Sequence, residues 1–470
     1  MKLYNSLTRE IEEFKPINEK EVHIYTCGPT VYNYSHVGNF RTYIMEDVLV
    51  KLLRYDGYNV KRVMNITDVG HLSGESDFGE DKMLKGAKRE HKSVKEIAKF
   101  YTDAFFADCK ELNIAYPDVV EPATNCIDKY IEIISKLIEK GFAYFAGGNV
   151  YFDTSKLEQY HKFYNFKEED LEIAVREDVE EDVNKRNKND FVLWFTKSKF
   201  EEQALKWESP WGVGYPGWHI ECSGIAIKHL GEYVDIHCGG IGNVFPHHTN
   251  EIAQSESYLG HKWCNCWMHV LHVHLSGGKM SKSKGEFITV SVLKEKGFTG
   301  AEYRFFCLQS HYRNQLMFSY DILENSANAF RKLKAKILKL TDNGEFEAGK
   351  FENYKNEFAD CVNNDLNTAK ALAVLHKLVK DDSVNDFTKR KLFEDFDKVL
   401  SLDLLKVDDC LENKIECNLS SEEILKRIEE RNNAKKNKDY NLADSIRDDL
   451  LNNGIKLIDT KDGTTYEFVK

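Results

Sequence analysis

The chain has 470 residues, of which 42% are hydrophobic and 12% aromatic, and its formal net charge is −12. This length predicts about three domains, and the composition suffices for several buried cores, which argues against a disordered chain. The negative charge argues against indiscriminate nucleic-acid binding, which relies on diffuse positive charge, although a local basic face can still contact RNA. No uncharged apolar run approaches the roughly 18–20 residues that cross a bilayer, so we expect no membrane span.

The eleven cysteines form no recognisable disulfide framework, and the N-terminal residues lack the apolar core of a signal peptide. Reduced thiols in a cytoplasmic protein, a few of them on a metal ion, fit this pattern best.

The N-terminal pattern predicts a parallel sheet. Residues 21–27 alternate as a strand does, and Gly28-Pro29 marks a turn. Ser35 is a plausible N-cap, and the apolar residues after it lie on one helical face. Residues Val60–Ile66 are predicted to form the next strand. A strand–helix–strand order of this length predicts a doubly wound α/β fold.

The motif His36-Val37-Gly38-Asn39 falls where the first strand gives way to the helix. Backbone N–H groups at a helix N-terminus favour phosphate. This position therefore favours phosphate binding beside His36.

The rest of the chain divides by composition. Residues 70–95 are charged and glycine-rich, which predicts an irregular excursion, and helical patterns fill about 95–140. Short strands and an acidic, asparagine-rich run follow over 150–215. Glycine, histidine and cysteine are dense from 218 to 283, as expected where strand ends converge on a site. Beyond about 300 the pattern is helical.

The pentapeptide Lys279-Met280-Ser281-Lys282-Ser283 follows Gly277-Gly278 and precedes Gly285, so we expect a mobile loop. It matches a loop that carries two lysines to the phosphates of ATP. With the His36–Asn39 motif it forms the paired nucleotide signature of class I aminoacyl-tRNA synthetases.

Further stretches of the sequence indicate one family within this class. The chain resembles the cysteinyl-tRNA synthetase family along nearly its whole length. The matching stretches are residues 25–32, 36–39, 65–68, 191–194, 216–223, 246–254, 267–269, 279–283 and 459–466.

The resemblance implies a zinc site made by Cys27, Cys222, His247 and Glu251. His247 and Glu251 stand four residues apart, on one face of a helix, and the four donors make a plausible zinc set. His248 competes with His247, because its spacing to Glu251 also works. Cys238, Cys264 and Cys266 are interpreted as structural, since the family has no fixed ligand there.

Further roles are implied by the resemblance alone. Gly28 and Thr67 correspond to positions beside the amino and carboxyl groups of bound cysteine. Trp218 and His237 match positions that close over it, although an ordinary core tryptophan is the alternative. The predicted ATP-binding residues are His36, Gly38, Asn39, Gly239, Gly240 and Lys282.

One departure from the family pattern concerns ATP. Many relatives have an aspartate facing the adenosine ribose where this chain has Gly242. We expect weaker ATP binding there, or compensation by Asn243.

The C-terminal residues resemble the anticodon-reading module of the family. Tyr440 occupies a position where an aromatic ring stacks on a base, and Asp444, Arg447 and Asp459 are predicted to read base edges. A helix-surface salt bridge is the alternative for each of them. A separate basic run, Arg331–Lys339, is a further candidate RNA contact or simply a solvated helix face.

These expectations combine into a synthetase that joins L-cysteine to tRNA(Cys) through an adenylate. It would use one Zn²⁺ per chain, Mg²⁺ with ATP, and His36, Asn39, Lys279 and Lys282 in catalysis, as a monomer. The expected division is 1–115 and 216–300 for the halves of the catalytic domain, 116–215 for a connective insertion, 301–412 for a stem-contact and helical region, and 413–470 for the anticodon module.

Two alternative functions are also compatible with the sequence. A paralogous ligase of the same fold joins activated cysteine to a small amine, but those relatives lack the C-terminal module. A non-catalytic RNA-binding relative would be expected to have lost the lysine loop or the metal donors.

Overall fold

The structure is a computed structural model. It describes residues 1–19, 21–69, 81–158, 160, 182–197, 205–275, 278–279, 287–407, 421–437, 439–452, 455–460 and 463–468. The chain forms two compact units, Met1–Leu405 and Lys406–Lys470. Among the described residues, none of the helices combines the length and hydropathy that a membrane span requires.

A five-stranded sheet lies at the centre of the first unit, and every neighbouring pair in it is parallel. Its strands, in spatial order, are β11 (Cys264–Val270), β10 (Val234–Gly240), β3 (Glu21–Thr26), β4 (Asn59–Ile66) and β5 (Val119–Pro122). The chain moves outward from β3 to β5 and then returns to the other side of β3 for β10 and β11. This order confirms the predicted doubly wound fold, and its switch point lies between β3 and β10.

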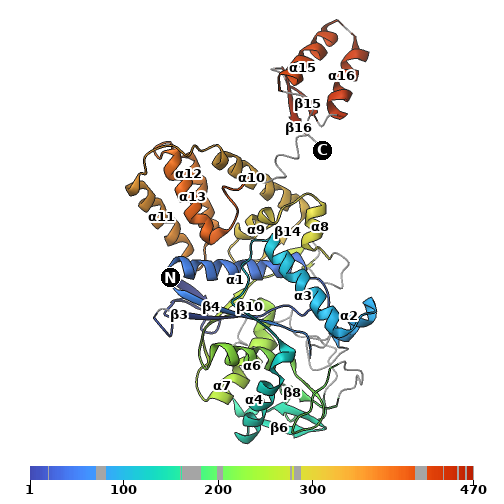
Figure 1. The fold of residues 1–470 in the computed structure, drawn as a ribbon, viewed down its shortest axis with the longest axis vertical. Coiled ribbons are helices and arrows are strands. Elements are labelled where there is room, and N and C mark those ends of the chain that lie inside the picture. The colour runs from blue at the N-terminus through green and yellow to red at the C-terminus, as the bar shows by residue number, and fades with distance from the viewer. Residues whose placement is uncertain are drawn as a thin grey trace. The chain divides into compact units, whose positions relative to one another are not determined.

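Helix α1 (Val37–Tyr55) connects β3 to β4 and lies on one face of the sheet (Figure 1). The expected N-cap, Ser35, is wrong by one residue. His36 is the N-cap, because its Nδ1 accepts the Asn39 amide 3.2 Å away, while the Asn39 side-chain oxygen accepts the His36 amide at 3.2 Å. This reciprocal capping box explains why the two polar residues stand three apart.

Helices α2 (Lys82–Glu90) and α3 (Val94–Glu111) occupy part of the segment expected to be irregular, so that expectation is wrong over 82–90. Asp81 caps α2 by accepting two backbone amides, and Ser93 caps α3. The Phe105 ring of α3 stacks on Phe40 of α1 with centroids 5.6 Å apart, so α3 packs directly on the helix of the nucleotide motif.

The opposite face of the sheet is covered by a second layer of helices (Figure 1). These are α4 (Ile127–Glu139), α6 (Trp218–Leu230) and α7 (Thr249–Leu259). A four-stranded antiparallel sheet adjoins them, made of β6 (Ala143–Ala146), β7 (Asn149–Phe152), β8 (Phe191–Phe195) and β9 (Tyr215–Pro216). Short turns occur at η1 (Ala123–Cys126), η2 (Thr154–Lys156), η3 (Ile241–Asn243) and η4 (Val244–His248).

The remainder of the first unit is mainly helical. Its helices are α8 (Val290–Glu295), α9 (Gly300–Leu308), α10 (Tyr320–Leu338), α11 (Ala348–Val362), α12 (Thr368–Lys380) and α13 (Asp386–Leu400). A small sheet joins β12 (Val273–Leu275) to β13 (Gly278–Lys279) and β14 (Leu316–Phe318), and the N-terminus forms the hairpin β1 (Lys2–Asn5) and β2 (Glu10–Glu13). Their apolar faces share one core with α1.

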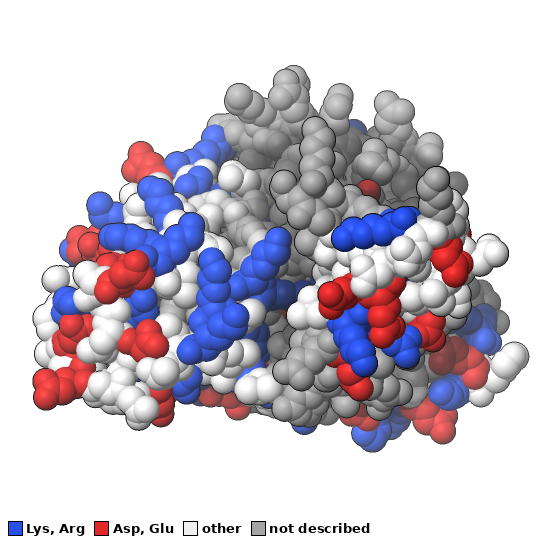
Figure 2. Space-filling model, turned by 90° about the horizontal axis from the view of Figure 1, so that it is seen from above, with Lys and Arg blue, Asp and Glu red and all other residues white. Residues whose placement is uncertain are grey.

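The second unit contains α15 (Ser421–Lys436), α16 (Tyr440–Asn452) and the antiparallel pair β15 (Ile455–Thr460) and β16 (Gly463–Phe468). It has its own core around Ile424, Ile428, Leu450 and Ile455. On the face drawn in Figure 2, Lys and Arg form local groups among Asp and Glu.

Candidate metal centre and active site

The candidate metal centre lies at the switch point of the sheet, where α/β proteins bind ligands beyond the carboxyl ends of their strands. Cys27 follows β3 directly, and His237 belongs to the neighbouring strand β10. Cys222 comes from α6, and Glu251 from α7. Four separate elements therefore bring these side chains together.

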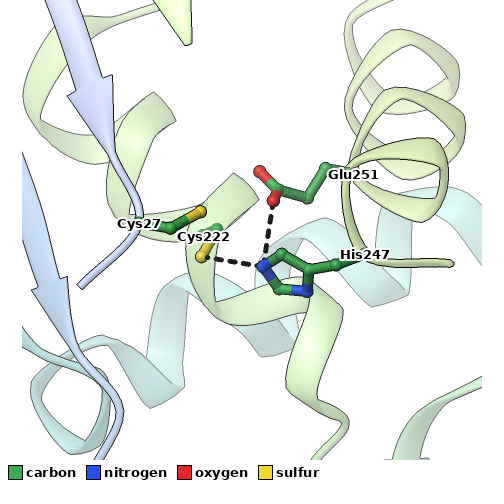
Figure 3. Close-up of side chains that lie close together, drawn as sticks. All are labelled: Cys27, Cys222, His247 and Glu251. Carbon is green, nitrogen blue, oxygen red and sulfur yellow. Dashed lines mark hydrogen bonds and ion pairs between the residues drawn. The ribbon is translucent and has the colours of Figure 1, made fainter. Parts of the chain in front are cut away.

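The four predicted zinc ligands converge. One donor atom from each of Cys27, Cys222, His247 and Glu251 lies within 4.8 Å of all the others, and the four residues are buried. The Nε2 of His247 lies 3.4 Å from the Cys222 sulfur and 3.1 Å from Oε1 of Glu251 (Figure 3). The helical spacing predicted for His247 and Glu251 thus turns both side chains toward the two thiols.

A second set of donors overlaps the first. Cys27, His237, His248 and Glu251 also lie within 4.8 Å of one another. The Nε2 of His248 is 3.2 Å from the Cys27 sulfur, and its Nδ1 is 2.8 Å from Nε2 of His269. In the structure, both His247 and His248 are therefore placed to bind a metal ion, each together with Cys27 and Glu251.

The first set, Cys27, Cys222, His247 and Glu251, has the donor chemistry of a divalent-cation site. Burial raises the pKa of the Cys27 and Cys222 thiols and of the Glu251 carboxyl, and it lowers the pKa of His247. Isolated in a buried site, thiolates and carboxylates are costly charges. A metal ion compensates for that cost and binds the deprotonated forms. Two sulfurs, a nitrogen and an oxygen are a donor set that zinc accepts.

Neighbouring rings orient His247. The Nδ1 of His219 lies 3.0 Å from Nδ1 of His247, which directs the opposite ring nitrogen toward Cys222 and Glu251. Trp218 stacks on the same imidazole, with centroids 4.1 Å apart and an interplanar angle of 23°. Trp218, predicted to close over bound cysteine, thus lies against one of the candidate metal ligands.

The predicted cysteine-binding residues Gly28 and Thr67 meet at Asn65. The Asn65 side chain accepts the Gly28 amide at 2.7 Å and donates to the Thr67 hydroxyl at 3.0 Å. A Cβ at position 28 would lie 1.7 Å from the Asn65 carbonyl oxygen, so only glycine fits. The Thr67 hydroxyl in turn donates to the buried carboxylate of Glu221 at 3.0 Å.

Sequence reasoning missed His219, Asn65 and Glu221 as members of this site. All three fall within stretches matched to the family, but nothing in their spacing distinguishes them from core residues. Burial of Glu221 beside Cys222 raises the pKa of its carboxyl, a perturbation visible only in three dimensions.

The chain just beyond the second nucleotide motif contacts the N-terminus of α1. The Val37 amide donates to the Ile288 carbonyl at 2.8 Å, and the Phe287 ring meets His36 edge-on at 5.9 Å. Residues 287–288 come four and five positions after Ser283, the last residue of the lysine–serine motif. These two described residues therefore lie beside the His36–Asn39 motif.

Arg41, also missed by the sequence analysis, fixes the segment that leads into the loop. This buried guanidinium of α1 donates to the carbonyls of Leu271 at 2.9 Å, His272 at 3.1 Å and His311 at 3.0 Å. Leu271 and His272 immediately precede β12, the strand that begins the loop's hairpin. Helix α1 thus holds both ends of the segment.

The remaining predicted nucleotide residues lie along this edge or outside the described residues. Gly239 and Gly240 end β10, and Gly242 lies in the turn η3 that follows. The backbone of Lys279 pairs with His274 in the β12–β13 ladder. The Lys279 side chain and the whole of Lys282 lie outside the described residues.

The predicted anticodon residues belong to the second unit. Tyr440 begins α16 and is 62% exposed. Asp444 and Arg447 lie on the same helix and form an ion pair of 3.0 Å, which is the alternative that the sequence left open. Asp459 lies in β15 opposite Thr464, and its side chain is outside the described part of the structure.

Comparison with known families agrees with this geometry. The sequence matches the model of the tRNA synthetases class I (C) catalytic domain over residues 13–328 and that of the DALR domain over residues 357–401. The first match covers the parallel sheet, the metal centre and both nucleotide motifs. The class is therefore that of the class I tRNA synthetases.

Full-length relatives define the family more closely. A cysteine–tRNA ligase of Treponema denticola is 46% identical, with 99% of each chain covered. One of Borrelia garinii is 44% identical, with 99% of this chain and 98% of the relative covered. The chain belongs to the cysteine–tRNA ligase family.

Solved structures support the fold. A Mycobacterium tuberculosis methionyl-tRNA synthetase bound by methionyl-adenylate superposes with a TM-score of 0.56 at 14% identity. The match covers 86% of this chain and 95% of that one. At this identity the likeness establishes the architecture and not the amino-acid substrate.

Proposed function

We propose that this protein ligates L-cysteine to tRNA(Cys) in two steps. Cysteine and ATP give cysteinyl-adenylate and pyrophosphate, and the cysteinyl group then passes to a ribose hydroxyl of the tRNA with release of AMP. The observation that carries the amino-acid assignment is the buried set of two thiols, an imidazole and a carboxylate at the sheet's switch point.

Cys27, Cys222, His247 and Glu251 would hold one Zn²⁺. When bound, zinc would supply a soft Lewis acid for the substrate's own thiolate. Serine offers only a weakly coordinating hydroxyl. A pocket lined by carbon distinguishes such near-isosteres by only about 10–200-fold, so metal–sulfur bonding would provide selectivity that packing alone does not.

The remaining amino-acid contacts would come from the residues around Asn65. The Gly28 amide already donates to the Asn65 side chain. The carbonyl oxygen of Gly28 would therefore be the group that accepts the substrate ammonium. Thr67 would lie beside the substrate carboxyl group, and Trp218 and His237 would exclude water and larger side chains.

Adenylation requires charge stabilisation more than proton transfer, because the attacking carboxylate is already ionised. His36, Gly38 and Asn39 would contact phosphate at the N-terminus of α1, and Gly239 and Gly240 would allow close approach of the nucleotide. Lys279 and Lys282 would neutralise the negative charge on the departing pyrophosphate, with Mg²⁺ accompanying ATP.

The second unit would read the anticodon. Tyr440 would stack on a base, a contact worth about 1–3 kcal/mol, while Asp444, Arg447 and Asp459 would contact base edges. We further propose a cytoplasmic monomer with the division 1–115, 116–215, 216–300, 301–412 and 413–470. The folded second unit favours tRNA as acceptor over a small amine.

Aminoacylation of a tRNA(Cys) transcript with radiolabelled cysteine tests the proposal. Acid-precipitable cysteinyl-tRNA that depends on ATP would support it. Consumption of ATP with label appearing only on an added small amine would instead favour the paralogous ligase. Tight tRNA binding without any transfer would favour the non-catalytic relative.

A further inference from the structure

Residues 82–99, which include α2 and the start of α3, are here called the basic segment. Their net charge is positive, opposite in sign to that of the whole chain. The segment contains seven Lys and Arg and only two Asp and Glu, whereas the whole chain has a net charge of −12. Lys85, Lys88 and Lys92 are exposed, and they lie close in sequence on α2 and the turn that follows it. A local excess of this kind is the electrostatic footprint expected for a polyanion.

Exposed aromatic rings accompany the charges. Tyr34 and Phe100 are each 40% exposed, and their centroids lie 6.0 Å apart in an edge-to-face contact. The ammonium of Lys92 lies 4.5 Å from the Phe100 centroid. Rings of this size are usually buried, whereas base-stacking surfaces of RNA-binding proteins combine exposed aromatic rings with cations.

The basic segment is held against the chain that leads into the nucleotide motif. Arg89 donates to the Tyr32 carbonyl at 2.9 Å and to the Tyr101 hydroxyl at 3.0 Å. A Cβ at Gly86 would lie 2.9 Å from the Tyr32 carbonyl oxygen, so α2 approaches this segment as closely as glycine permits. His36, the N-cap of α1, follows Tyr32 by four residues, so the basic segment is bonded to the chain that leads directly into the proposed adenylate site.

The other basic candidate is weaker. Along α10, Arg331 is bound to Glu302 at 2.6 Å and to Glu324 at 3.0 Å, and Lys334 is buried. The charge of that run is thus partly neutralised by neighbouring acids. In the basic segment Arg89 and Lys92 also pair with an acid, Glu90, at 2.8 and 3.8 Å. The segment is nevertheless the better docking surface, because seven Lys and Arg stand against two Asp and Glu and exposed rings lie beside them.

We propose that the basic segment, with Tyr34 and Phe100, binds the acceptor arm of the tRNA and guides its 3′ end toward the His36–Asn39 motif. This inference rests on the proposed function and assigns a second RNA contact, distinct from the anticodon module. Lysines on the segment bind backbone phosphates, and the exposed rings stack on unpaired bases of the 3′ end.

The test compares the triple variant K85Q/K88Q/K92Q with a matched control, K129Q/K136Q/K140Q, which removes as many lysines from and beside α4 beneath the sheet. The probes are an acceptor–T-arm minihelix and an anticodon stem–loop of tRNA(Cys). We expect the triple variant to bind the minihelix at least about tenfold more weakly, with the salt slope reduced by about two. Its affinity for the anticodon hairpin, and both affinities of the control, should be unchanged.

A second variant separates stacking from charge. Phe100→Ala should weaken minihelix binding about 5- to 100-fold while leaving its salt slope unchanged. Unchanged minihelix affinity and salt slope in the triple variant would overturn the proposal, as would equal weakening of both RNA probes.

Cysteine-dependent exchange of pyrophosphate into ATP needs no tRNA and reports on folding of the catalytic centre. Normal exchange in the triple variant, with weakened minihelix binding, is the expected result. Absence of exchange in the unaltered, metal-loaded protein would overturn the proposed function itself. Normal exchange with unaltered minihelix binding would overturn only the docking of the acceptor arm.

Discussion

His237 and Glu251 form a fully buried pair in which Nε2 of the imidazole lies 2.8 Å from Oε2 of the carboxylate. The other carboxylate oxygen, Oε1, lies 3.1 Å from Nε2 of His247. His237 therefore fixes the plane of the carboxylate so that one oxygen remains directed at the candidate metal ligands. Partners that orient metal ligands in this way commonly change metal affinity about 10–100-fold when removed.

We predict that His237→Ala weakens zinc binding by about that factor of 10–100, because Glu251 loses the donor that orients it. His237→Gln retains an N–H donor and should recover much of the affinity. Competition with a chromophoric chelator measures both. If zinc affinity is unchanged and only the KM for cysteine rises, His237 acts on the amino acid and not on the metal site.

The overlapping donor sets can be separated by single substitutions. We expect His247→Ala to reduce bound zinc far below one ion per chain, because the two-thiol set loses its nitrogen donor. His248→Ala should retain most of the metal, since Cys27, Cys222, His247 and Glu251 remain. Metal analysis of both purified variants after dialysis measures this. The reverse pattern would assign the site to His237 and His248.

Arg41 is predicted to act as a positioning residue for the lysine–serine loop. Lysine cannot reach the carbonyls of Leu271, His272 and His311 together, so Arg41→Lys should lower the rate of cysteine-dependent pyrophosphate exchange about 10–100-fold and raise the KM for ATP. The KM for cysteine should change little, because the metal centre is not touched.

Arg304 supplies the matched control for Arg41. It is equally buried and donates to the carbonyls of Leu400 at 2.6 Å and Leu112 at 3.1 Å, with an ion pair to Asp47. Arg304→Lys should lower thermal stability and leave the KM for ATP unchanged. Equal kinetic effects of the two substitutions would mean that Arg41 contributes only to stability.

Asp108 provides a pH-dependent test of stability. Burial, with a smaller contribution from Glu111, raises its pKa to about 6. The folded state then binds this proton more tightly than the unfolded chain, so the ionised carboxylate destabilises the fold above about pH 6 and not below about pH 4.

Asp108→Asn should consequently raise the free energy of unfolding at pH 8 by about 1 kcal/mol, since solvent screening reduces the effect of a half-buried carboxylate. Urea unfolding at several pH values measures the gain. It should shrink as the pH falls from 6 to about 4. A gain independent of pH would contradict the assignment to ionisation.

The sequence predicted those elements whose local pattern and packing agree. Alternation along residues 21–27 indicated the strand β3, and residues 60–66 were correctly predicted as the next strand, β4. The i, i+4 spacing of His247 and Glu251 placed both on one face. Helix α2 was missed because its glycine and charges favour a loop locally. Its helical state is stabilised by burial of Met83, Gly86 and Ala87, of which Met83 and Ala87 pack in one cluster with Ile66 and Ile97.

Strand β5 was missed for a related reason. It has four residues, too few for a periodic pattern, and it is defined by pairing with β4. His219 and Arg41 were also overlooked, because their roles depend on neighbours far along the chain. Contacts such as Arg41 with His311 bridge 270 positions and have no local signature.

We expect the metal-centred site to select cysteine for adenylation. Exchange of labelled pyrophosphate into ATP, measured without tRNA on zinc-loaded protein with cysteine or with serine, tests it most directly. We predict exchange with cysteine and none above background with an equal concentration of serine. Comparable exchange with both amino acids, or none with cysteine, would contradict selection of cysteine by this site.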